Sequence, residues 1–371
     1  MKIKTRLIAS VLIVIMAVAC KKQAINANQN GTVQSSGVVS TLAGSSSPGF
    51  VNGTGTAASF DYPTGVATDA SGNIYVADRS NSVIRKVTPA GVVTTFASGF
   101  SEGFDSSAVV TVPFNRPYGV AVDAAGNVYV ADYGNHSIRK IYPSGTGISL
   151  AGSNTIGFVN GTGSAASFNY PTGVAVDAAN NVYVADYYNN AIRKITPAGV
   201  VTTFAGSGNI GSSDGIGQAA SFNKPYGVAV DASGNVYVGD RGNNTIRKIT
   251  PQGVVSTLAG SGVAGSNDGT GTAATFNNPC QLTIDPSGNI YVADFDNNKI
   301  RKVTSSGVVT TYAGSGAIGS QNGPAATATF YSPSGVAIDA YGTVYVADYS
   351  NHLIRSIKPS NGEAESKPKE E

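Results

Sequence analysis

Six prolines recur at a constant spacing of 54 residues, and the same motif follows each of them. The prolines are Pro63, Pro117, Pro171, Pro225, Pro279 and Pro333. The unit that begins at Pro171, for example, reads PTGVAVDAANNVYVADYYNNAIRKITPAGVVTTFAG. A fixed period of this length means that the chain repeats one small structural unit, which buries its apolar residues against its neighbours.

Each unit contains four short runs that are rich in β-branched and aromatic residues. In the third unit these runs are GVAVD, NVYVAD, AIRKIT and GVVTTFAG, and residues typical of turns separate them. The second run is apolar on both faces, as expected for a sheet that is packed between two others. Repeated units of four antiparallel strands predict an all-β fold, a six-bladed β-propeller of four-stranded blades.

The two ends of the array complement each other. The last unit stops after its third run, LIRSIK at 353–358, whereas GVVSTLAG at 37–44 matches the missing fourth run. We therefore expect the N-terminal strand to complete the last blade. Closing the ring in this way removes the free sheet edges that would otherwise pair with other chains.

The motifs P-x-G-[VI]-A-[VI]-D, G-N-[VI]-Y-V-A-D and N-[HNS]-x-I-R-K resemble the NHL repeat family over residues 37–358, and Asn351, His352 and Leu353 spell its name. The resemblance implies a six-bladed propeller. It leaves the function open, since such propellers bind proteins or RNA, serve as sensors, and in some cases catalyse reactions.

The N-terminal segment is typical of a bacterial lipoprotein signal. A basic start, MKIKTR, precedes a run of 13 apolar residues, which is too short to span a bilayer as a helix. AVAC resembles a lipobox that ends at Cys20; the alternative is an ordinary signal peptide cleaved after AVA. We expect a signal peptide at 1–19, lipidation at Cys20, a polar tether at 20–36 and a charged disordered tail at 359–371. The protein would then be lipid-anchored in the cell envelope, facing the periplasm or the cell surface.

The charge of the repeat region argues against nucleic-acid binding. The whole chain carries a formal charge of +2, but much of the positive charge lies in the first 22 residues. The segment 37–358 has 17 basic and 18 acidic residues, whereas nucleic-acid-binding proteins present a basic surface. We expect a monomer that binds an unknown protein, peptide or glycan, with no cofactor and no nucleic acid, and that contacts the membrane only through the lipid.

One acidic and one basic residue recur at fixed positions in every unit, and we interpret both as structural. An aspartate ends the second strand and an arginine lies in the third, so that an Asp–Arg pair can fix neighbouring turns. Catalytic acids need different environments, whereas six equivalent copies share one. The residues are Asp78, Asp132, Asp186, Asp240, Asp294 and Asp348, with Arg85, Arg139, Arg193, Arg247, Arg301 and Arg355.

Candidate binding residues are those at which the repeat symmetry breaks. Strand parity places the turn after the second strand and the long inter-blade loop on one face, which we call the top face. This face holds most of the sequence variation, and binding usually resides on variable loops above a rigid scaffold. Tyrosine and arginine are favoured at binding surfaces. The candidate residues, called the rim below, are Arg79, Tyr118, Tyr133, Tyr187, Tyr226, Arg241, Gln281, Phe295 and Tyr349.

The two histidines, His136 and His352, occupy one repeat position. In the other units this position holds Ser82, Asn190, Asn244 and Asn298. Because it accepts several small polar residues and lies away from the axis, we interpret the histidines as part of the scaffold. On blades two apart, they would be too distant to share a metal ion.

The sequence therefore favours a non-catalytic binding propeller, with no catalytic or metal-binding residue assigned. The alternative is a propeller enzyme of the lactonase or lyase type with a metal ion in the axial channel. That alternative requires Glu, Asn, Asp or several His on the innermost strands, which instead read TGVATD, YGVAVD and CQLTID. Two weaker alternatives are a reactive Cys280 and cation binding at glycine-rich loops such as 52–60.

Overall fold

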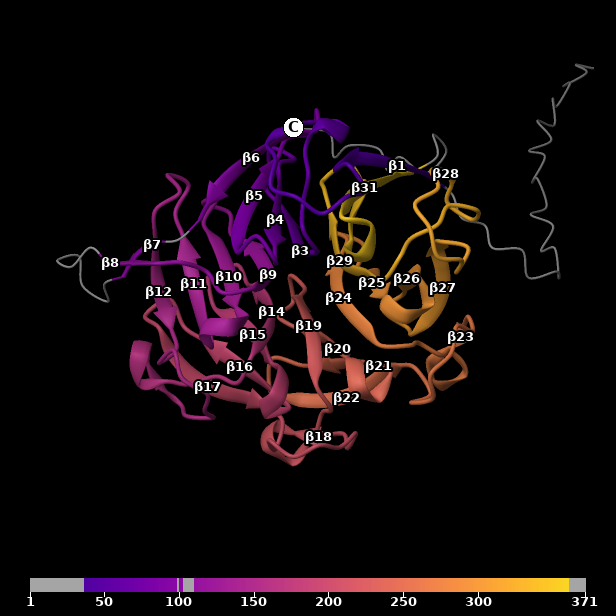
Figure 1. The fold of residues 1–371 in the computed structure, drawn as a ribbon. Coiled ribbons are helices and arrows are strands. Elements are labelled where there is room, and N and C mark those ends of the chain that lie inside the picture. Colours follow the sequence, from indigo (N-terminus) through magenta and orange to yellow (C-terminus); the bar gives the residue numbers. More distant parts are fainter. Residues whose placement is uncertain (1–36, 99, 103–109, 360–371) are drawn as a thin grey trace, which may run out of the picture. The chain divides into compact units, whose positions relative to one another are not determined.

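The computed structural model describes residues 37–98, 100–102 and 110–359, which form six β-sheets arranged around a central axis (Figure 1). The fold prediction, an all-β six-bladed propeller, is confirmed. The expected signal peptide, Cys20, the tether and all of the tail except Pro359 lie outside the described residues. No helix in the described ranges is long and apolar enough to cross a membrane.

We number the blades 1 to 6 by their innermost strands, each of which begins at a repeat proline. The innermost strands are β3 (Pro63–Thr68), β9 (Pro117–Val122), β14 (Pro171–Val176), β19 (Pro225–Val230), β24 (Pro279–Ile284) and β29 (Pro333–Ile338). The second strands are β4 (Ile74–Asp78), β10 (Val128–Asp132), β15 (Val182–Asp186), β20 (Val236–Asp240), β25 (Ile290–Asp294) and β30 (Val344–Asp348).

The third and fourth strands complete each blade outward. The third strands are β5 (Val83–Val87), β11 (Ser137–Ile141), β16 (Ala191–Ile195), β21 (Thr245–Ile249), β26 (Lys299–Val303) and β31 (Leu353–Lys358). The fourth strands are β6 (Val92–Ala97), β12 (Gly147–Ala151), β17 (Val200–Ala205), β22 (Val254–Ala259), β27 (Val308–Ala313) and, for blade 6, β1 (Val38–Ala43). The pairing of β1 with β31 is antiparallel and joins the first described strand to the last.

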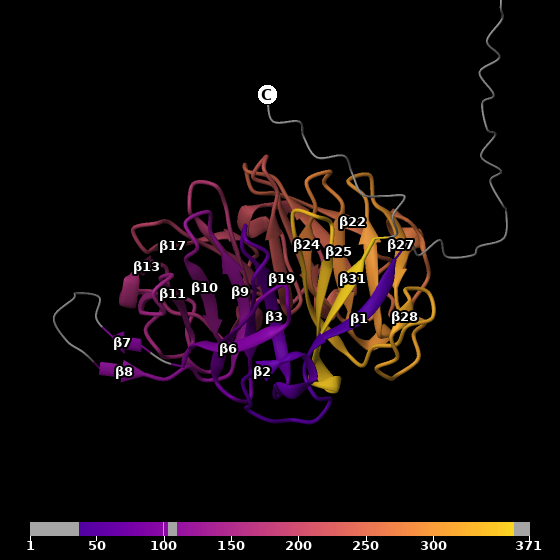
Figure 2. The ribbon, with the colours of Figure 1, turned by 90° about the horizontal axis from the view of Figure 1, so that it is seen from above.

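The prediction of four strands per blade is incomplete, because five of the sheets have five strands. The inter-blade loop pairs two residues with the outer strand of the following blade. These added strands are β2 (Gly53–Thr54), β13 (Gly161–Thr162), β18 (Gly215–Ile216), β23 (Gly269–Thr270) and β28 (Gly323–Pro324). Blade 2 keeps four strands, since the loop before it carries β7 (Phe100–Glu102) and β8 (Val110–Val112), which pair with each other and project from the edge of the ring (Figures 1 and 2).

Single 3₁₀ turns occur in two recurring places. One group lies in the inter-blade loops: η1 (Gly55–Ala57), η3 (Gly163–Ala165), η5 (Gly217–Ala219) and η7 (Gly271–Ala273). The other group joins the second and third strands on the top face: η2 (Tyr133–Asn135), η4 (Tyr187–Asn189), η6 (Arg241–Asn243), η8 (Phe295–Asn297) and η9 (Tyr349–Asn351).

Apolar layers between neighbouring blades form the core. Each layer combines valines, isoleucines and alanines from two adjacent sheets with a phenylalanine from the loop that connects them. Phe168, Phe222 and Phe276, for example, are completely buried. Burying such a ring contributes about 1.5–3 kcal/mol relative to leaving it exposed. The repeated loop sequence therefore supplies a phenylalanine that packs into the interface between neighbouring blades.

A glycine near the start of the innermost strand permits the close approach of neighbouring blades. A Cβ atom on Gly173 would lie only 2.5 Å from the carbonyl oxygen of Tyr226 in the next blade. Gly65, Gly119, Gly227 and Gly335 face equivalent carbonyl groups at 2.2–2.4 Å. Blade 5 has Gln281 at this position, so this blade alone places a side chain there.

A buried ion pair fixes the turn between the second and third strands of each blade. In blade 3, Nη1 of Arg193 donates to Oδ2 of Asp186 at 2.8 Å, and both side chains are completely buried. Asp186 also accepts hydrogen bonds from Nδ2 of Asn189 and from the backbone N–H of Asn169, each at 2.8 Å. Burial raises the pKa of Asp186 to about 6, and Arg193 and these hydrogen bonds limit the increase.

The same arginine holds the inter-blade loop. Arg193 donates to the carbonyl oxygens of Ser167 and Val159 and, at 2.7 Å, to Oδ1 of Asn160. Its guanidinium group lies 5.3 Å from the ring centroid of the buried Phe168. All six blades contain the Asp–Arg pair, at 2.7–3.0 Å. In blade 2, Arg139 binds Asp132 through Nε instead of Nη1. This is the blade whose preceding loop carries β7 and β8.

A second aspartate caps the turn on the opposite face. Oδ1 of Asp177 accepts hydrogen bonds from the backbone N–H groups of Ala179 and Asn181. Oδ2 accepts hydrogen bonds from Nδ2 of Asn181 and from the hydroxyl of Tyr183. The turn is thus held by its own side chains, which explains why its sequence scarcely varies.

Replacing Arg193 by Met should lower the free energy of unfolding by about 3–5 kcal/mol, because Asp186 would remain buried without its counter-ion. Denaturant titration measures the change. Lys194→Ser is the matched control, since Ser356 occupies the same position in blade 6, and should change stability by less than about 1 kcal/mol. Similar stabilities for the two variants would contradict the structural role of the pair.

Candidate functional site

The symmetry-breaking residues lie at three positions of each blade on the top face. One precedes the repeat proline, one follows it, and one follows the aspartate that ends the second strand. The residue before the proline has a left-handed backbone, with φ of 52–55° in all six blades. These fixed backbone positions let the side chains vary without changing the scaffold.

Eight of the nine rim residues form a connected group on this face. Nη1 of Arg79 donates to the hydroxyl of Tyr349 at 3.1 Å, and its guanidinium lies 5.2 Å from the ring centroid of Tyr118. The guanidinium of Arg241 lies 5.2 Å from the ring centroids of both Tyr226 and Phe295. Contacts between Tyr118 and Tyr226, at 5.9 Å, and between Phe295 and Tyr349, at 6.0 Å, complete a loop around the axis.

Six tyrosines make a second closed series of contacts over blades 2 to 4, which we call the tyrosine circuit. Neighbouring ring centroids are 4.4–6.2 Å apart, within the range of favourable aromatic contacts. In order, the circuit is Tyr118, Tyr133, Tyr170, Tyr188, Tyr187 and Tyr226.

Burial raises the pKa of Tyr133, and the nearby hydroxyls of Tyr118, Tyr188, Tyr187 and Tyr170 raise it further. The pKa values of Tyr187 and Tyr226 are also raised, chiefly by burial. These three phenol groups are therefore neutral at physiological pH. Each offers an aromatic face together with a hydroxyl that donates and accepts hydrogen bonds.

Sequence reasoning placed Tyr170 among the variable positions without selecting it, and it missed Tyr188 entirely. Tyr188 is 45% exposed and contacts Tyr187 and Tyr170. The available signal was the pair Tyr187-Tyr188, found in the third unit alone, where other units have Ser, Gly or Asp as the second residue. This pair does not reveal from the sequence alone that the rings of the two adjacent tyrosines contact each other.

Gln281, the ninth rim residue, lies in the axial channel. A Cβ atom on Gly65 would meet its Nε2 at 2.9 Å, and one on Gly335 would meet its Oε1 at 3.2 Å, so the amide lies beside blades 1 and 6. The neighbouring Cys280 is fully buried, and burial raises the pKa of its thiol to about 12. Such a thiol is a poor nucleophile.

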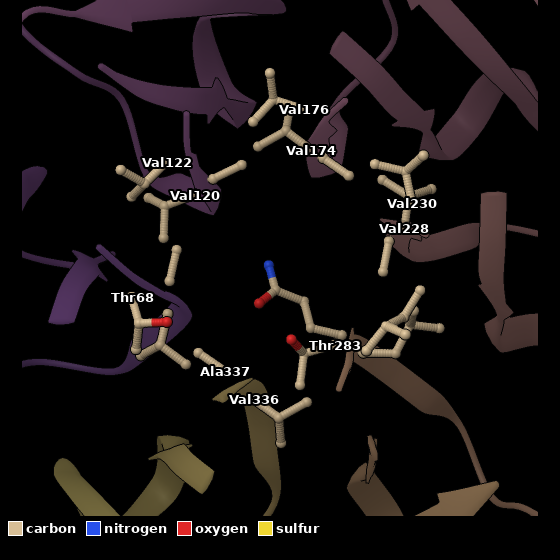
Figure 3. A pocket seen from close by; sticks show the side chains of 18 residues that line it. Thr68, Val120, Val122, Val174, Val176, Val228, Val230, Thr283, Val336 and Ala337 are labelled. Carbon is tan, nitrogen blue, oxygen red and sulfur yellow. The ribbon is translucent and has the colours of Figure 1, made fainter. Parts of the chain in front are cut away.

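The channel holds a cavity of about 200 Å³ surrounded by the innermost strands (Figure 3). Its wall consists mainly of valines and alanines, such as Val120, Val174 and Val228. The polar side chains in this wall are Gln281, Thr68 and Thr283. Among the described residues, no group of three or more His, Cys, Asp or Glu side chains is placed to hold a metal ion.

Both histidines accept a hydrogen bond that joins two blades. Nδ1 of His352 accepts from the backbone N–H of Tyr62, and Nδ1 of His136 accepts from that of Tyr170, each at 3.1 Å. Oδ1 of Asn190 accepts in the same way from Lys224 at 2.9 Å. Both histidines have a left-handed backbone, which Asn and His adopt more readily than most residues.

Comparison with known proteins identifies the repeat. The model of the NHL repeat matches residues 60–86, 114–141, 168–195, 222–249 and 330–355, and the chain therefore contains NHL repeats within its propeller. The divergent fifth unit, which contains Cys280 and Gln281, is not among the matched segments.

Known proteins resemble this chain in sequence or in fold. Protein SUPPRESSOR OF QUENCHING 1, chloroplastic, from Arabidopsis thaliana is 31% identical over a 290-residue alignment that covers 73% of this chain and 28% of that protein. This chain thus spans less than a third of that relative. A structural genomics protein of unknown function from Bacteroides thetaiotaomicron superimposes with a TM-score of 0.68 at 22% identity, covering 87% of this chain and 76% of the other. An auxiliary nutrient binding protein from Bacteroides ovatus superimposes with a TM-score of 0.66 at 20% sequence identity, and the match covers 88% of this chain and 78% of the other.

Replacing both histidines by Asn should remove one acid-induced loss of stability. Burial lowers the pKa of His136 and His352 below 6.5, and Asp61 partly offsets this for His352. The unfolded chain therefore binds protons more readily, and stability falls as the pH drops through about 6.5. Each lost hydrogen bond is worth about 1 kcal/mol.

The measurement is the melting temperature of the wild type and of the His136→Asn/His352→Asn variant between pH 8 and pH 5. The difference between the curves isolates the histidines, because every aspartate is common to both proteins. The variant should match the wild type at pH 8 and exceed it at pH 5. A constant difference across this range would show that the pKa values of the histidines are the same in the folded and the unfolded chain, which would contradict the prediction.

Proposed function

We propose that this protein is a non-catalytic binding propeller that captures a protein, peptide or glycan on its top face. The observation that carries the proposal is the clustering of half-buried tyrosines and arginines at the positions where the repeat symmetry breaks. Aromatic and arginine side chains dominate binding energy at many interfaces. The scaffold positions beneath them, such as the pair of Asp186 and Arg193, are already engaged in holding the fold.

The composition of the channel favours binding over catalysis. A metal-dependent lactonase or lyase needs carboxylate, amide or imidazole ligands that converge on the axis. In the part of the chain that the structure describes, the channel wall provides valines, alanines, Leu282, Ile284, two threonines and Gln281. The aspartates of the blades are instead engaged in turns and ion pairs.

We also propose that the protein is held outside the cytoplasm by a lipid on Cys20. The support is the lipobox-like AVAC, the basic and apolar segment before it, and the polar segment that follows it. The protein of similar fold from Bacteroides ovatus is described as an auxiliary nutrient binding protein, which supports a binding role.

Simultaneous replacement of Tyr133, Tyr187 and Arg241 by Ala should weaken capture of the partner from a cell-envelope extract at least about a hundredfold, given about 1–2 kcal/mol or more for each anchor residue. Tyr341→Ser, on the opposite face and 74% exposed, is the control. The melting temperature of both variants should stay near that of the wild type. Undiminished capture by the triple variant would exclude the top face as the binding surface.

Labelling of growing cells with a radioactive or clickable fatty acid tests the anchor. The wild-type protein should incorporate the label and fractionate with membranes, because acylation adds about 0.8 kcal/mol of membrane affinity per buried methylene group. Cys20→Ser should carry no label and should leave the membrane fraction, whereas Cys280→Ser should behave as the wild type. Equal labelling of wild type and Cys20→Ser would rule out this site.

A further inference from the structure

We propose that the tyrosine circuit and the two arginines beside it bind a carboxylate-bearing glycan of the uronic acid type. This inference rests on the proposed function and names the class of ligand for the same face. It draws on three properties of the site: its charge, its aromatic surface, and the state of its backbone groups.

The charge of the site calls for an anion. Arg79 lies against Tyr118 and Arg241 lies against Tyr226, which is the neighbour of Tyr118 in the circuit. Lys224 lies 5.8 Å from the ring of Tyr188. Among the described residues, neither arginine has a carboxylate within 4.0 Å, unlike the six scaffold arginines. Asp296 also acts electrostatically on Arg241, and its carboxylate accepts a hydrogen bond from Asn278.

This balance of charges argues against a cationic ligand, although aromatic cages often bind quaternary ammonium groups. Three cationic side chains border the circuit, and they would repel such a ligand. A guanidinium group instead binds a carboxylate through two parallel hydrogen bonds. The anionic part of the ligand is thereby placed beside Arg79 or Arg241, next to the neighbouring rings of Tyr118 and Tyr226.

The aromatic surface suits a sugar ring. Five of its phenol groups are at least partly exposed and present apolar surface edged with hydroxyls, whereas Tyr226 is buried. A pyranose has the complementary arrangement of apolar C–H faces and hydroxyl groups. Tyr188 and Tyr170 extend the surface away from the channel mouth, and Tyr188 is 45% exposed. A ligand of more than one sugar could therefore follow the circuit from an arginine to Tyr188.

The backbone of the top turns disfavours an extended peptide, which commonly binds through main-chain hydrogen bonds. The N–H group of Gly134 donates to the carbonyl oxygen of Asn115 at 2.8 Å, and that of Tyr188 donates to Asn169 at 3.1 Å. Gly242 repeats this bond with Asn223 at 2.8 Å. The turns thus offer side chains rather than free backbone N–H groups for binding. A glycan can be bound through such side-chain contacts alone.

The chain itself supplies substitutions that the scaffold tolerates. Arg79→Tyr and Arg241→Tyr remove charge but keep an aromatic ring, as at Tyr133, Tyr187 and Tyr349 in other blades. Tyr170→Ser and Tyr188→Ser remove rings, and other blades carry serine at both positions, in Ser332 and Ser350. Lys140→Ser and Tyr341→Ser remove a cation and a ring elsewhere and serve as controls.

The full-length protein in detergent is tested against oligomers of galacturonate, glucuronate and mannuronate, the neutral galactan, glucan and mannan counterparts, and poly-glutamate. At least one uronate oligomer should bind at least tenfold more tightly than its neutral counterpart. The double arginine variant and the double tyrosine variant should each weaken this binding about tenfold or more, as expected for a lost charged hydrogen bond or aromatic contact. The controls should bind as the wild type does.

Failure to prefer any uronate over its neutral counterpart would overturn the proposal, as would uronate binding that the arginine and tyrosine variants leave unchanged. Tighter binding of poly-glutamate through the same residues would identify an acidic peptide as the ligand instead. The proposed function is judged separately by capture from the envelope extract. If capture depends on the rim and no uronate binds, the binding face stands and only the ligand class is wrong.

Discussion

The ion pair between the aspartate at the end of the second strand and the arginine of the third strand supports the rest of the propeller. Removing two charges from water is unfavourable unless every polar atom around them finds a partner. In blade 3, Nη1 and Nη2 of Arg193 meet most of this requirement by binding Asp186, Asn160 and two loop carbonyl oxygens, whereas its buried Nε has no hydrogen-bond partner among the described residues. One side chain therefore fixes the turn on the top face and the path of the inter-blade loop together.

Because the loop is fixed, its phenylalanine lies in the interface between two blades. Phe168 is completely buried there, with the guanidinium of Arg193 against its ring. In five blades a histidine or asparagine at the end of the top turn accepts a hydrogen bond from the following blade, and Ser82 takes this position in blade 1. Blade-to-blade contact thus depends on polar anchors as well as on apolar packing, and the repeat preserves both sets of residues.

The fold could be predicted from the sequence because every unit repeats the same signals. The proline spacing, the turn residues and the missing last strand together specify six blades. The two-residue fifth strands could not be predicted, since a segment such as Gly161–Thr162 pairs only because the loop above it is held by the arginine. Such pairing is a consequence of tertiary structure and leaves no local pattern.

The candidate site was only partly predictable for a related reason. Variation among the units indicates which positions are free to change, and so pointed to Tyr133, Tyr187 and Arg241. It does not show which side chains meet across blades. The contact between Tyr170 and Tyr188, at 5.4 Å, depends on the left-handed backbone before the proline and on the 3₁₀ turn η4.

In a repeat protein whose scaffold residues and binding residues occupy different positions, the ligand can change while the fold stays the same. The scaffold residues are buried and shared by all blades, so a substitution at one of them weakens an interface. The rim residues lie on backbone that is already fixed by those contacts. Tyr188 and Arg241 are therefore free to be selected for the chemistry of a ligand, and blades that began as copies can each contribute a different group to one asymmetric surface.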